Sequence, residues 1–295
     1  MQNNNECCLL FDVGGTGIKV GVYDTFGELS DELQEYPSKA EKTKEEIFDN
    51  FYKIILELKG DKKLTKIGFA FPGPFDFANG ISLMKGINKY DAIYGISIRD
   101  ELLKRDNSFA ETQMLFLHDI EAFARGCYSC GEAADYDSIM CLCIGTGAGS
   151  CFIKNGQVIK YSEKGVPDNG WIYNTPFREG IIDDYVSVRG LSHLTQRSIG
   201  EDIDGYELYL RCLSMDPEAL RVFEAFGEIV VQAIAPFIEE FKPEAFILGG
   251  QISKSFAFFG GPLRKLLNRR NIRIILEGNT SKRAMQGLLA EMKTL

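Results

Sequence analysis

Residues 9–24 read LLFDVGGTGIKVGVYD, and residues 140–156 read MCLCIGTGAGSCFIKNG. Each stretch is an apolar segment, a turn rich in Gly and Thr, a second apolar segment and a polar turn. This order is typical of a β-hairpin with a glycine-rich tip. The two stretches begin about 131 residues apart, which is too long a period for a solenoid repeat. The sequence therefore predicts two similar halves, each containing one such hairpin.

The segments between the hairpins predict further strands and several helices. Residues 66–83 (KIGFAFPGPFDFANGISL) have the pattern of a strand, a turn and a strand. Residues 245–255 (AFILGGQISKS) have that of a buried strand, a Gly pair and a helix start. Thr43 and Glu46 form a capping box at the start of the first helix. Helices are expected at residues 43–59, 120–134, 217–240 and 282–294. This mixture predicts an α/β fold whose sheets are mixed rather than all parallel.

Charge and hydropathy argue against several classes of protein. The chain has 295 residues and a net charge of −9, and no cluster of four or more Lys or Arg interrupts its acidic background. We therefore expect no nucleic-acid partner, and a phosphate site that uses backbone amides and a metal ion. Purely apolar stretches are under ten residues long, too short to span a bilayer, so no membrane partner is expected. The N-terminus has no basic region typical of a signal peptide, which favours a cytoplasmic location with reduced thiols.

The eight cysteines raise the question of a zinc site. Cys127 and Cys130 form a CxxC pair on an expected helix, and Cys141, Cys143 and Cys151 follow in strand-like segments. A structural zinc site needs four placed ligands, usually in two pairs, and the two histidines of the chain could contribute. Because Cys141 and Cys143 alternate with apolar residues, we interpret these cysteines as small buried side chains, with a metal site as the alternative.

The GGTG turn of the first hairpin has the chemistry of an anion site. Gly14, Gly15 and Gly17 lack Cβ atoms, so their backbone N–H groups can approach a phosphate, and Thr16 adds a hydroxyl. Asp12 precedes the turn on the same side of the strand. A carboxylate facing a phosphate needs a cation between them, and Mg²⁺ would meet that need. A single turn of this kind is often only a tight turn, and neither the Walker pattern nor GxGxxG before a helix is present.

Five motifs, in order along nearly the whole chain, resemble those of the ROK family of sugar kinases (repressor, open reading frame, kinase). FDVGGTGIKVGVYD and LCIGTGAGSCFIKNGQVI resemble its two phosphate motifs, and AFPGPFD resembles the segment before its sugar loop. FLHDIEAFARG resembles the segment with the catalytic aspartate, and FILGGQISKS the Gly pair on the adenosine side. The resemblance implies the two-lobed fold of the actin, hexokinase and Hsp70 superfamily, with a cleft between the lobes.

The same resemblance implies an activity and a set of site residues. The activity is ATP-dependent phosphorylation of a hexose or a hexose derivative such as an N-acylhexosamine or a glycoside, with the 6-hydroxyl as the usual acceptor and Mg²⁺ accompanying ATP. Asp119 would act as general base on the sugar hydroxyl, although an aspartate that opens a helix can also serve as its N-cap. The implied ATP-binding residues are Asp12 (also the Mg²⁺ residue), Gly14, Gly15, Thr16, Gly145, Thr146, Gly147, Gly249 and Gly250. The implied sugar-binding residues are Gly73, Asn88, His118, Asp119, Asp168 and Asp183. The family resemblance also suggests a homodimer.

The chain departs from the family pattern around the sugar. Asp168 and Asp183 stand at the positions of two sugar-binding glutamates, Trp171 at that of a histidine, and His118 at that of an asparagine. The cysteines of the family's zinc knuckle are missing, so no structural zinc is expected, and Trp171 is expected to anchor the loop 160–181. Each Asp carboxylate would retreat by about 1.3–1.5 Å relative to Glu. This extra room favours a substrate larger or less usual than glucose.

Two other functions compete with a kinase. The repressor branch of the family carries an N-terminal DNA-binding domain, and because the first phosphate motif here begins at residue 9, we expect this chain not to belong to that branch. A degenerate protein that binds sugar without turnover is the alternative that the altered positions suggest. The expected lobes are residues 1–117 with 283–295, and residues 118–282.

Overall fold

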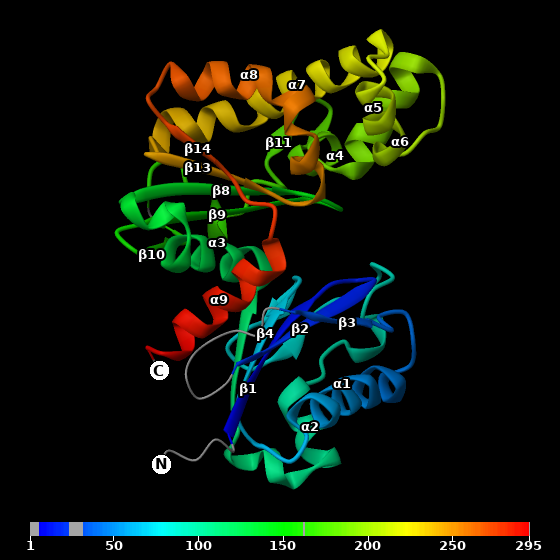
Figure 1. Ribbon diagram of the computed structural model, residues 1–295, viewed down its shortest axis with the longest axis vertical. Helices are drawn as coiled ribbons and strands as arrows, with labels where there is room; N and C mark the ends of the chain where they lie inside the picture. Colours follow the sequence, from blue (N-terminus) through cyan, green and yellow to red (C-terminus); the bar gives the residue numbers. More distant parts are fainter. Residues whose placement is uncertain (1–5, 24–31, 162, 295) are drawn as a thin grey trace. The chain divides into compact units, whose positions relative to one another are not determined.

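The computed structural model describes residues 6–23, 32–161 and 163–294 (Figure 1). The chain divides into two compact units, Met1–Ser129 with Ser281–Leu295, and Cys130–Thr280. The boundary expected from the sequence lies between residues 117 and 118, which is one helix earlier than the boundary in the structure, between residues 129 and 130. The helix that contains Asp119 belongs to the first unit, for the packing reason given below.

The first unit is built on a five-stranded mixed sheet in the order β3-β2-β1-β4-β7. The first hairpin pairs β1 with β2, and β3 continues the antiparallel side, while β4 and β7 run parallel to β1. These strands are β1 (Glu6–Val13), β2 (Gly17–Tyr23), β3 (Gln34–Pro37), β4 (Lys63–Phe71) and β7 (Gln113–His118).

The second unit repeats this arrangement in the order β10-β9-β8-β13-β14. Its hairpin pairs β8 with β9, β10 is again antiparallel, and β13 and β14 run parallel to β8. The two similar halves predicted from the sequence are therefore confirmed strand by strand. The strands are β8 (Ser138–Ile144), β9 (Ala148–Lys154), β10 (Gln157–Ile159), β13 (Ala245–Gly249) and β14 (Arg273–Leu276).

Aromatic side chains fix the register of the parallel strands in the first unit. Phe11 lies opposite Phe69, which lies opposite Phe116, and their rings stack with centroids 4.8 and 5.1 Å apart. All three are nearly or fully buried. A one-residue slip would turn this ladder to the other face of the sheet, so burial strongly specifies the register. The carboxyl ends of β1, β4 and β7 are thereby aligned.

Helices cover both faces of the first sheet. On one face lie α1 (Lys44–Lys59) and α2 (Ile98–Arg105), and α1 begins at the expected capping box. The other face packs against α3 (Asp119–Cys130) and α9 (Thr280–Met292). A Cβ added at Gly126 would overlap the carbonyl oxygen of Arg283, and one at Gly287 that of Ala122. The backbones of α3 and α9 thus touch, which places α3 in the first unit.

The second sheet has its large core under the long helices α7 (Pro217–Phe241) and α8 (Phe256–Asn268). Met140, Leu142 and Phe152 are fully buried there. Pro217 occupies the first turn of α7, as expected. The shorter helices of this unit are α4 (Ile182–Tyr185), α5 (Val188–Ile199) and α6 (Gly205–Leu213). None of the helices in the described ranges is both long and apolar enough to cross a membrane.

Two small hairpins and several 3₁₀ turns complete the described chain. The hairpins are β5 (Phe75–Asp76) with β6 (Ile81–Ser82), and β11 (Pro176–Phe177) with β12 (Gly180–Ile181). The 3₁₀ turns are η1 (Asp91–Ile93), η2 (Asn107–Glu111), η3 (Glu132–Asp135), η4 (Asp168–Gly170) and η5 (Gln251–Ser255).

Candidate active site

The first glycine turn joins β1 to β2 and leaves two backbone donors open. The N–H of Gly14 donates to the carbonyl of Gly17 at 2.9 Å, which closes the turn. Among the described residues, the N–H groups of Gly15 and Thr16 have no acceptor. Backbone N–H groups rarely stay unpaired unless water or a ligand receives them. The turn therefore has the free donors that an anion site requires.

Hydroxyl groups from two other segments hold the carbonyls of this turn. Ser38 Oγ donates to the carbonyl of Gly15 at 2.6 Å, and the Tyr90 hydroxyl donates to that of Gly14 at 3.1 Å. The N–H of Ser38 also donates to the carbonyl of Thr16 at 3.2 Å. Because its oxygens are bound from outside, the turn is preorganised before any ligand arrives.

Asp12 and Asp119 form an electrostatically coupled pair of carboxylates in the first unit. Desolvation raises the pKa of Asp12, and the negative charge of Asp119 raises it further. A hydrogen bond from the buried hydroxyl of Ser281, in the first turn of α9, and the charge of Lys19 act in the opposite direction. The net pKa of Asp12 is above its ordinary value. The pair therefore favours a cation near these carboxylates.

Asp119 is held ionised by its neighbours. Its Oδ1 lies 2.8 Å from His118 Nδ1 and accepts the N–H of Ile120 at 2.6 Å. Desolvation raises the pKa of Asp119, but the charge and hydrogen bond of His118 and the Ile120 N–H outweigh it. The pKa of Asp119 therefore lies below its ordinary value of 3.8. The side chain is 44% exposed, so an ionised and accessible carboxylate stands where β7 meets α3.

Two other expected sugar-binding residues lie in the same unit. Gly73 lies directly beside the imidazole of His118, because a Cβ added at Gly73 would lie 3.2 Å from His118 Nε2. Asn88 is exposed in a tight bend, with a φ of 59°, and its N–H donates to Asp91 Oδ2 at 3.1 Å. The first unit thus contains Asp12, the first turn, Gly73, Asn88, His118 and Asp119.

The second glycine turn, between β8 and β9, repeats the features of the first. The N–H of Gly145 donates to the carbonyl of Gly147 at 3.0 Å, and no acceptor is found in the described chain for the N–H groups of Thr146 and Gly147. Asp183 Oδ1 accepts the N–H of Ala148 at 2.8 Å, and a Cβ at Gly147 would lie 2.7 Å from that oxygen. Asp183, expected at the sugar, is thus built into the support of this turn.

The third glycine pair lies beside the second turn. Gly249 ends β13, and Gly250 has a φ of 88°, which L side chains rarely adopt. A Cβ at Gly250 would overlap the backbone of Ile144, the last residue of β8. The structure therefore brings the second turn and the Gly pair together at the carboxyl ends of two neighbouring parallel strands, a common place for ligands in α/β sheets.

The loop 160–181 is anchored differently from the expectation. Trp171, the expected anchor, is only partly buried and contacts the ring of Tyr173. The buried residue is Ile172, with 0% exposure. Ser150 Oγ donates to the carbonyl of Gly170 at 2.6 Å and accepts the N–H of Ile172 at 2.9 Å. This clamp places the exposed Asp168 at the start of η4 in the second unit.

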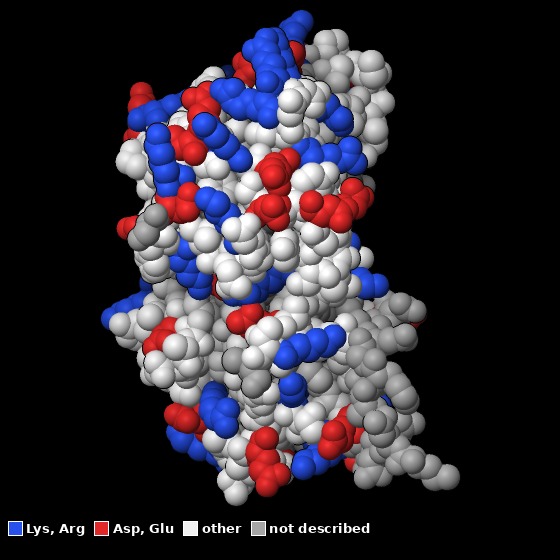
Figure 2. Space-filling view, turned by 90° about the vertical axis from the view of Figure 1, so that its left-hand side faces the viewer, with Lys and Arg blue, Asp and Glu red and all other residues white. Residues whose placement is uncertain are grey.

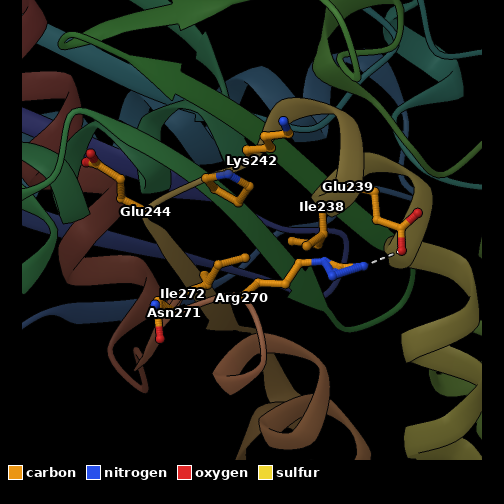
Figure 3. A pocket seen from close by; sticks show the side chains of 8 residues that line it. Ile238, Glu239, Lys242, Glu244, Arg270, Asn271 and Ile272 are labelled. Atoms are coloured by element: carbon orange, nitrogen blue, oxygen red, sulfur yellow. Dashed lines mark hydrogen bonds and ion pairs between the residues drawn. The ribbon is translucent and has the colours of Figure 1, made fainter.

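A cavity of about 580 Å³ lies at the other edge of the second sheet (Figure 3). Glu244, which borders it, immediately precedes β13, whereas the Gly pair lies at the far end of the same strand. Arg270 points toward Glu239 and forms an ion pair with it, so these two lining charges satisfy each other. The cavity is therefore separate from the glycine turns and shares none of their residues.

Charges on the surface are mixed in sign. Figure 2 shows acidic and basic side chains interspersed on the face that it presents. Of the five cysteines interpreted as buried, Cys127, Cys141 and Cys151 are buried, Cys143 is partly buried and Cys130 is exposed. In the described ranges, no group of three or more His, Cys, Asp and Glu is placed to hold a metal ion.

Comparison with known proteins decides the family. The model of the ROK family matches residues 8–281, which include both glycine turns, Asp119 and the Gly pair. The chain belongs to the ROK family. A glucokinase of Thermotoga maritima is 26% identical over 276 residues, covering 86% of this chain and 84% of that one. An N-acetyl-D-glucosamine kinase of Pasteurella multocida is 27% identical over 287 residues, covering 89% and 90%.

The fold of this ROK protein agrees with that of solved relatives. A ROK family glucokinase from Streptomyces griseus, solved with glucose and AMPPNP, matches with a TM-score of 0.76. The identity is 18%, and the match covers 98% of this chain and 100% of the other. The expected α/β fold of the actin and hexokinase type is therefore confirmed.

Several residues of this ROK protein were not singled out from the sequence. They hold the first turn, Asp12 or the loop 160–181 through contacts between segments that are distant in the sequence, which leave no local periodicity to detect. Lys89 and Tyr90 directly follow Asn88, and Ser150 lies within the second glycine-rich stretch, but residue type alone did not mark their roles. The residues are Ser38, Lys89, Tyr90, Ser150 and Ser281.

Proposed function

We propose that this ROK protein transfers the γ-phosphoryl group of ATP to a hydroxyl of a hexose or hexose derivative. The observation that carries the proposal is the coupling of Asp119, an ionised and accessible carboxylate, to Asp12, which precedes a turn with free donors. Phosphoryl transfer needs positioning, charge neutralisation and an acceptor for the hydroxyl proton. These residues would supply all three.

In the proposed mechanism, Asp119 is the general base. Its carboxylate accepts the proton of the sugar hydroxyl as the oxygen attacks the γ-phosphorus, and ADP leaves. The lowered pKa keeps Asp119 ionised at neutral pH. A weak base suffices, because the proton departs late in a loose transition state. The N–H groups of Gly15, Thr16, Thr146 and Gly147 would bind phosphate oxygens, and the Gly249–Gly250 pair would face the adenosine side.

The donor set beside the first turn fits Mg²⁺. This ion is bound by one or two carboxylates together with water and phosphate oxygens. Asp12 provides a carboxylate of this kind, and it is electrostatically coupled to a second one, Asp119. When bound, Mg²⁺ would neutralise charge on the ATP phosphates. Asp12 is the residue that we assign to hold it, with Ser281 orienting the Asp12 carboxylate.

We assign sugar binding to Gly73, Asn88, His118, Asp119, Asp168 and Asp183. An ionised carboxylate can accept about four hydrogen bonds, so Asp183 retains acceptor capacity beyond Ala148 and Arg189. The shorter Asp168 and Asp183, with the partly buried Trp171, favour a substituted hexose or a glycoside over glucose. A sugar panel tests this preference, and a higher kcat/KM for glucose than for every N-acyl sugar and glycoside would overturn it.

Sugar-dependent release of ADP tests the activity. Purified protein with Mg-ATP should release ADP in the presence of one or more sugars, with the product regiochemistry read by NMR. Asp119→Asn should lower kcat by about 10²–10⁴-fold while sugar binding stays largely intact. The matched control is Asp135→Asn, which changes an exposed aspartate and should leave turnover unchanged. Near-normal kcat in Asp119→Asn would remove Asp119 from the role of base.

The competing proposal is a protein of the same fold that binds sugar without turnover. The specific observation in its favour is that Asp183 is already engaged by Ala148 and Arg189. Calorimetric titration separates the two, since sugar affinity without ATP affinity would favour this alternative. We also propose a cytoplasmic location, where ATP is available, and a homodimer on the family resemblance, which sedimentation would test.

A further inference from the structure

The side chain of Lys89 lies directly against the first glycine turn. A Cβ added at Gly15 would lie 2.6 Å from Lys89 Cε, 2.7 Å from Cδ and 3.0 Å from Nζ. The space left by the missing side chain of Gly15 is therefore filled by the end of this lysine. Gly15 does more than permit a tight turn, because its lack of a side chain admits an ammonium group to the turn.

The bend that carries Lys89 is held on both sides. Tyr90 is fully buried, its N–H donates to the carbonyl of Ala40 at 2.7 Å, and its hydroxyl binds Gly14. On the other side, the Asp91 carboxylate accepts the N–H groups of Ile87 and Asn88 at 3.3 and 3.1 Å. The backbone on either side of Lys89 is thus fixed, and its reach to the turn is built into the fold.

The ammonium of Lys89 is not paired with any carboxylate of the described residues. Within the described part of the chain it forms no ion pair with Asp or Glu, and the side chain is partly buried. A cation placed beside the free N–H groups of Gly15 and Thr16 adds to their attraction for an anion. The turn therefore combines backbone donors with one uncommitted positive charge.

We propose that Lys89 is a catalytic residue whose ammonium contacts the transferring phosphoryl group at the first glycine turn. This inference rests on the proposed kinase function. In the transfer, the sugar oxygen bonds to the γ-phosphorus and the bond to the bridging oxygen of ADP breaks, leaving its electron pair on ADP. The hydroxyl proton goes to Asp119. Lys89 takes no part in this proton transfer, and its ammonium stabilises the charge on the phosphoryl oxygens.

The choice of the γ-phosphoryl group follows from the neighbours of the turn. Asp12 lies two residues before Gly14, and Asp12 is coupled electrostatically to Asp119, the proposed base. The base must stand beside the phosphoryl group that the hydroxyl attacks. The first turn, with Lys89 on Gly15, is then on the reacting side of the nucleotide.

Lys89→Met tests the proposal, since methionine keeps much of the apolar stem and removes the charge. We expect kcat to fall about 10²-fold or more. Affinity for the non-hydrolysable triphosphate AMPPNP should fall about tenfold relative to affinity for ADP. Lys89→Arg should recover part of both losses. The matched control is Lys85→Met, because the Lys85 ammonium lies over the ring of Tyr94 at 5.2 Å. It should behave like wild type.

The two readouts separate this proposal from the kinase function itself. If wild-type protein turns over no sugar, the kinase function fails, and the AMPPNP-to-ADP affinity ratio still decides the role of Lys89. An unchanged ratio in Lys89→Met, or a kcat within about threefold of wild type in an active enzyme, overturns the proposal. A thermal unfolding curve matching that of wild type ensures that a loss reflects the missing charge.

Discussion

His118 Nδ1 lies 2.8 Å from Oδ1 of Asp119. The N–H of Ile120 donates to the same oxygen at 2.6 Å and also lies within hydrogen-bond distance of His118 Nδ1, at 3.4 Å. The family usually has an asparagine where this chain has His118. The histidine supplies the same hydrogen bond and, when protonated, a positive charge as well. Desolvation of Asp119 by itself would raise its pKa, but the interactions with His118 outweigh it and keep the carboxylate ionised.

Replacing His118 should move the acid limb of the pH profile upward. In wild type the pKa of Asp119 lies below 3.8, so the base is ionised and contributes no acid limb to kcat/KM above pH 5. In His118→Leu the opposing interactions of the imidazole are gone, desolvation dominates, and the Asp119 pKa rises. Activity should then be lost as pH falls through that higher value, while the rate near pH 8 changes by less than about tenfold.

The pH profile of kcat/KM checks this shift. His118→Asn restores a hydrogen-bond donor without a charge and should lie between wild type and His118→Leu. The other histidine, His193, is exposed on α5, and His193→Leu should leave the profile unchanged. A His118→Leu profile that overlays the wild-type one would show that the imidazole does not set the pKa of the base.

Removing Asp183 should weaken nucleotide binding. Asp183→Ala deletes the acceptor of the Ala148 N–H and the side chain packed against Gly147, so the second turn loses its support. We expect the Kd for ATP to rise about tenfold. The comparison variant is Arg189→Met, which breaks ion pairs with Asp183 and Asp184 but leaves the Ala148 hydrogen bond; because the arginine is 53% exposed, it should cost under about 1 kcal/mol of binding free energy. Titration calorimetry with AMPPNP measures both, and equal effects would contradict a special role for Asp183.

The local patterns predicted much of this molecule. The repeated pattern of strand, glycine turn and strand predicted both hairpins, and the capping box of Thr43 and Glu46 predicted the start of α1. These signals could be detected because each is formed by residues close together in the sequence. The structure differs at the anchor of the loop 160–181, since Ile172, and not Trp171, is fully buried there, and its N–H binds Ser150, 22 residues earlier on β9. Contacts of this kind have no period along the chain.

The candidate site shows the same division. Asp12, Asp119 and the glycines were found by residue type and spacing, and the structure couples Asp12 to Asp119. The placement of Lys89 on Gly15 could not be predicted, because 74 residues separate them and only the folded bend brings them together. The division between the units was misplaced for a related reason, since α3 joins the first unit through backbone contact with α9 at the other end of the chain.

Ser150→Ala should destabilise the second unit. Its buried hydroxyl bonds to both Gly170 and Ile172, so the alanine variant leaves a buried carbonyl and a buried N–H without partners. We expect the free energy of unfolding to fall by about 2–3 kcal/mol. The single tryptophan, Trp171, lies between these two residues and reports the change by fluorescence during urea unfolding. Ser214→Ala, which removes an exposed hydroxyl, should change stability by less than about 0.5 kcal/mol.

Gly126→Ala should unfold the first unit or lower its stability by more than about 3 kcal/mol, because the added methyl overlaps the Arg283 carbonyl. The backbones of α3 and α9 would have to separate, and the core between α9 and the first sheet would open. The matched control is Gly261→Ala in α8, where a Cβ meets nothing within 4 Å. There the better helix propensity of alanine should stabilise by about 0.5–1 kcal/mol. Thermal unfolding should therefore show that the same Gly→Ala change lowers stability at residue 126 and raises it at residue 261. A Gly126→Ala variant as stable as wild type would disprove the direct backbone contact.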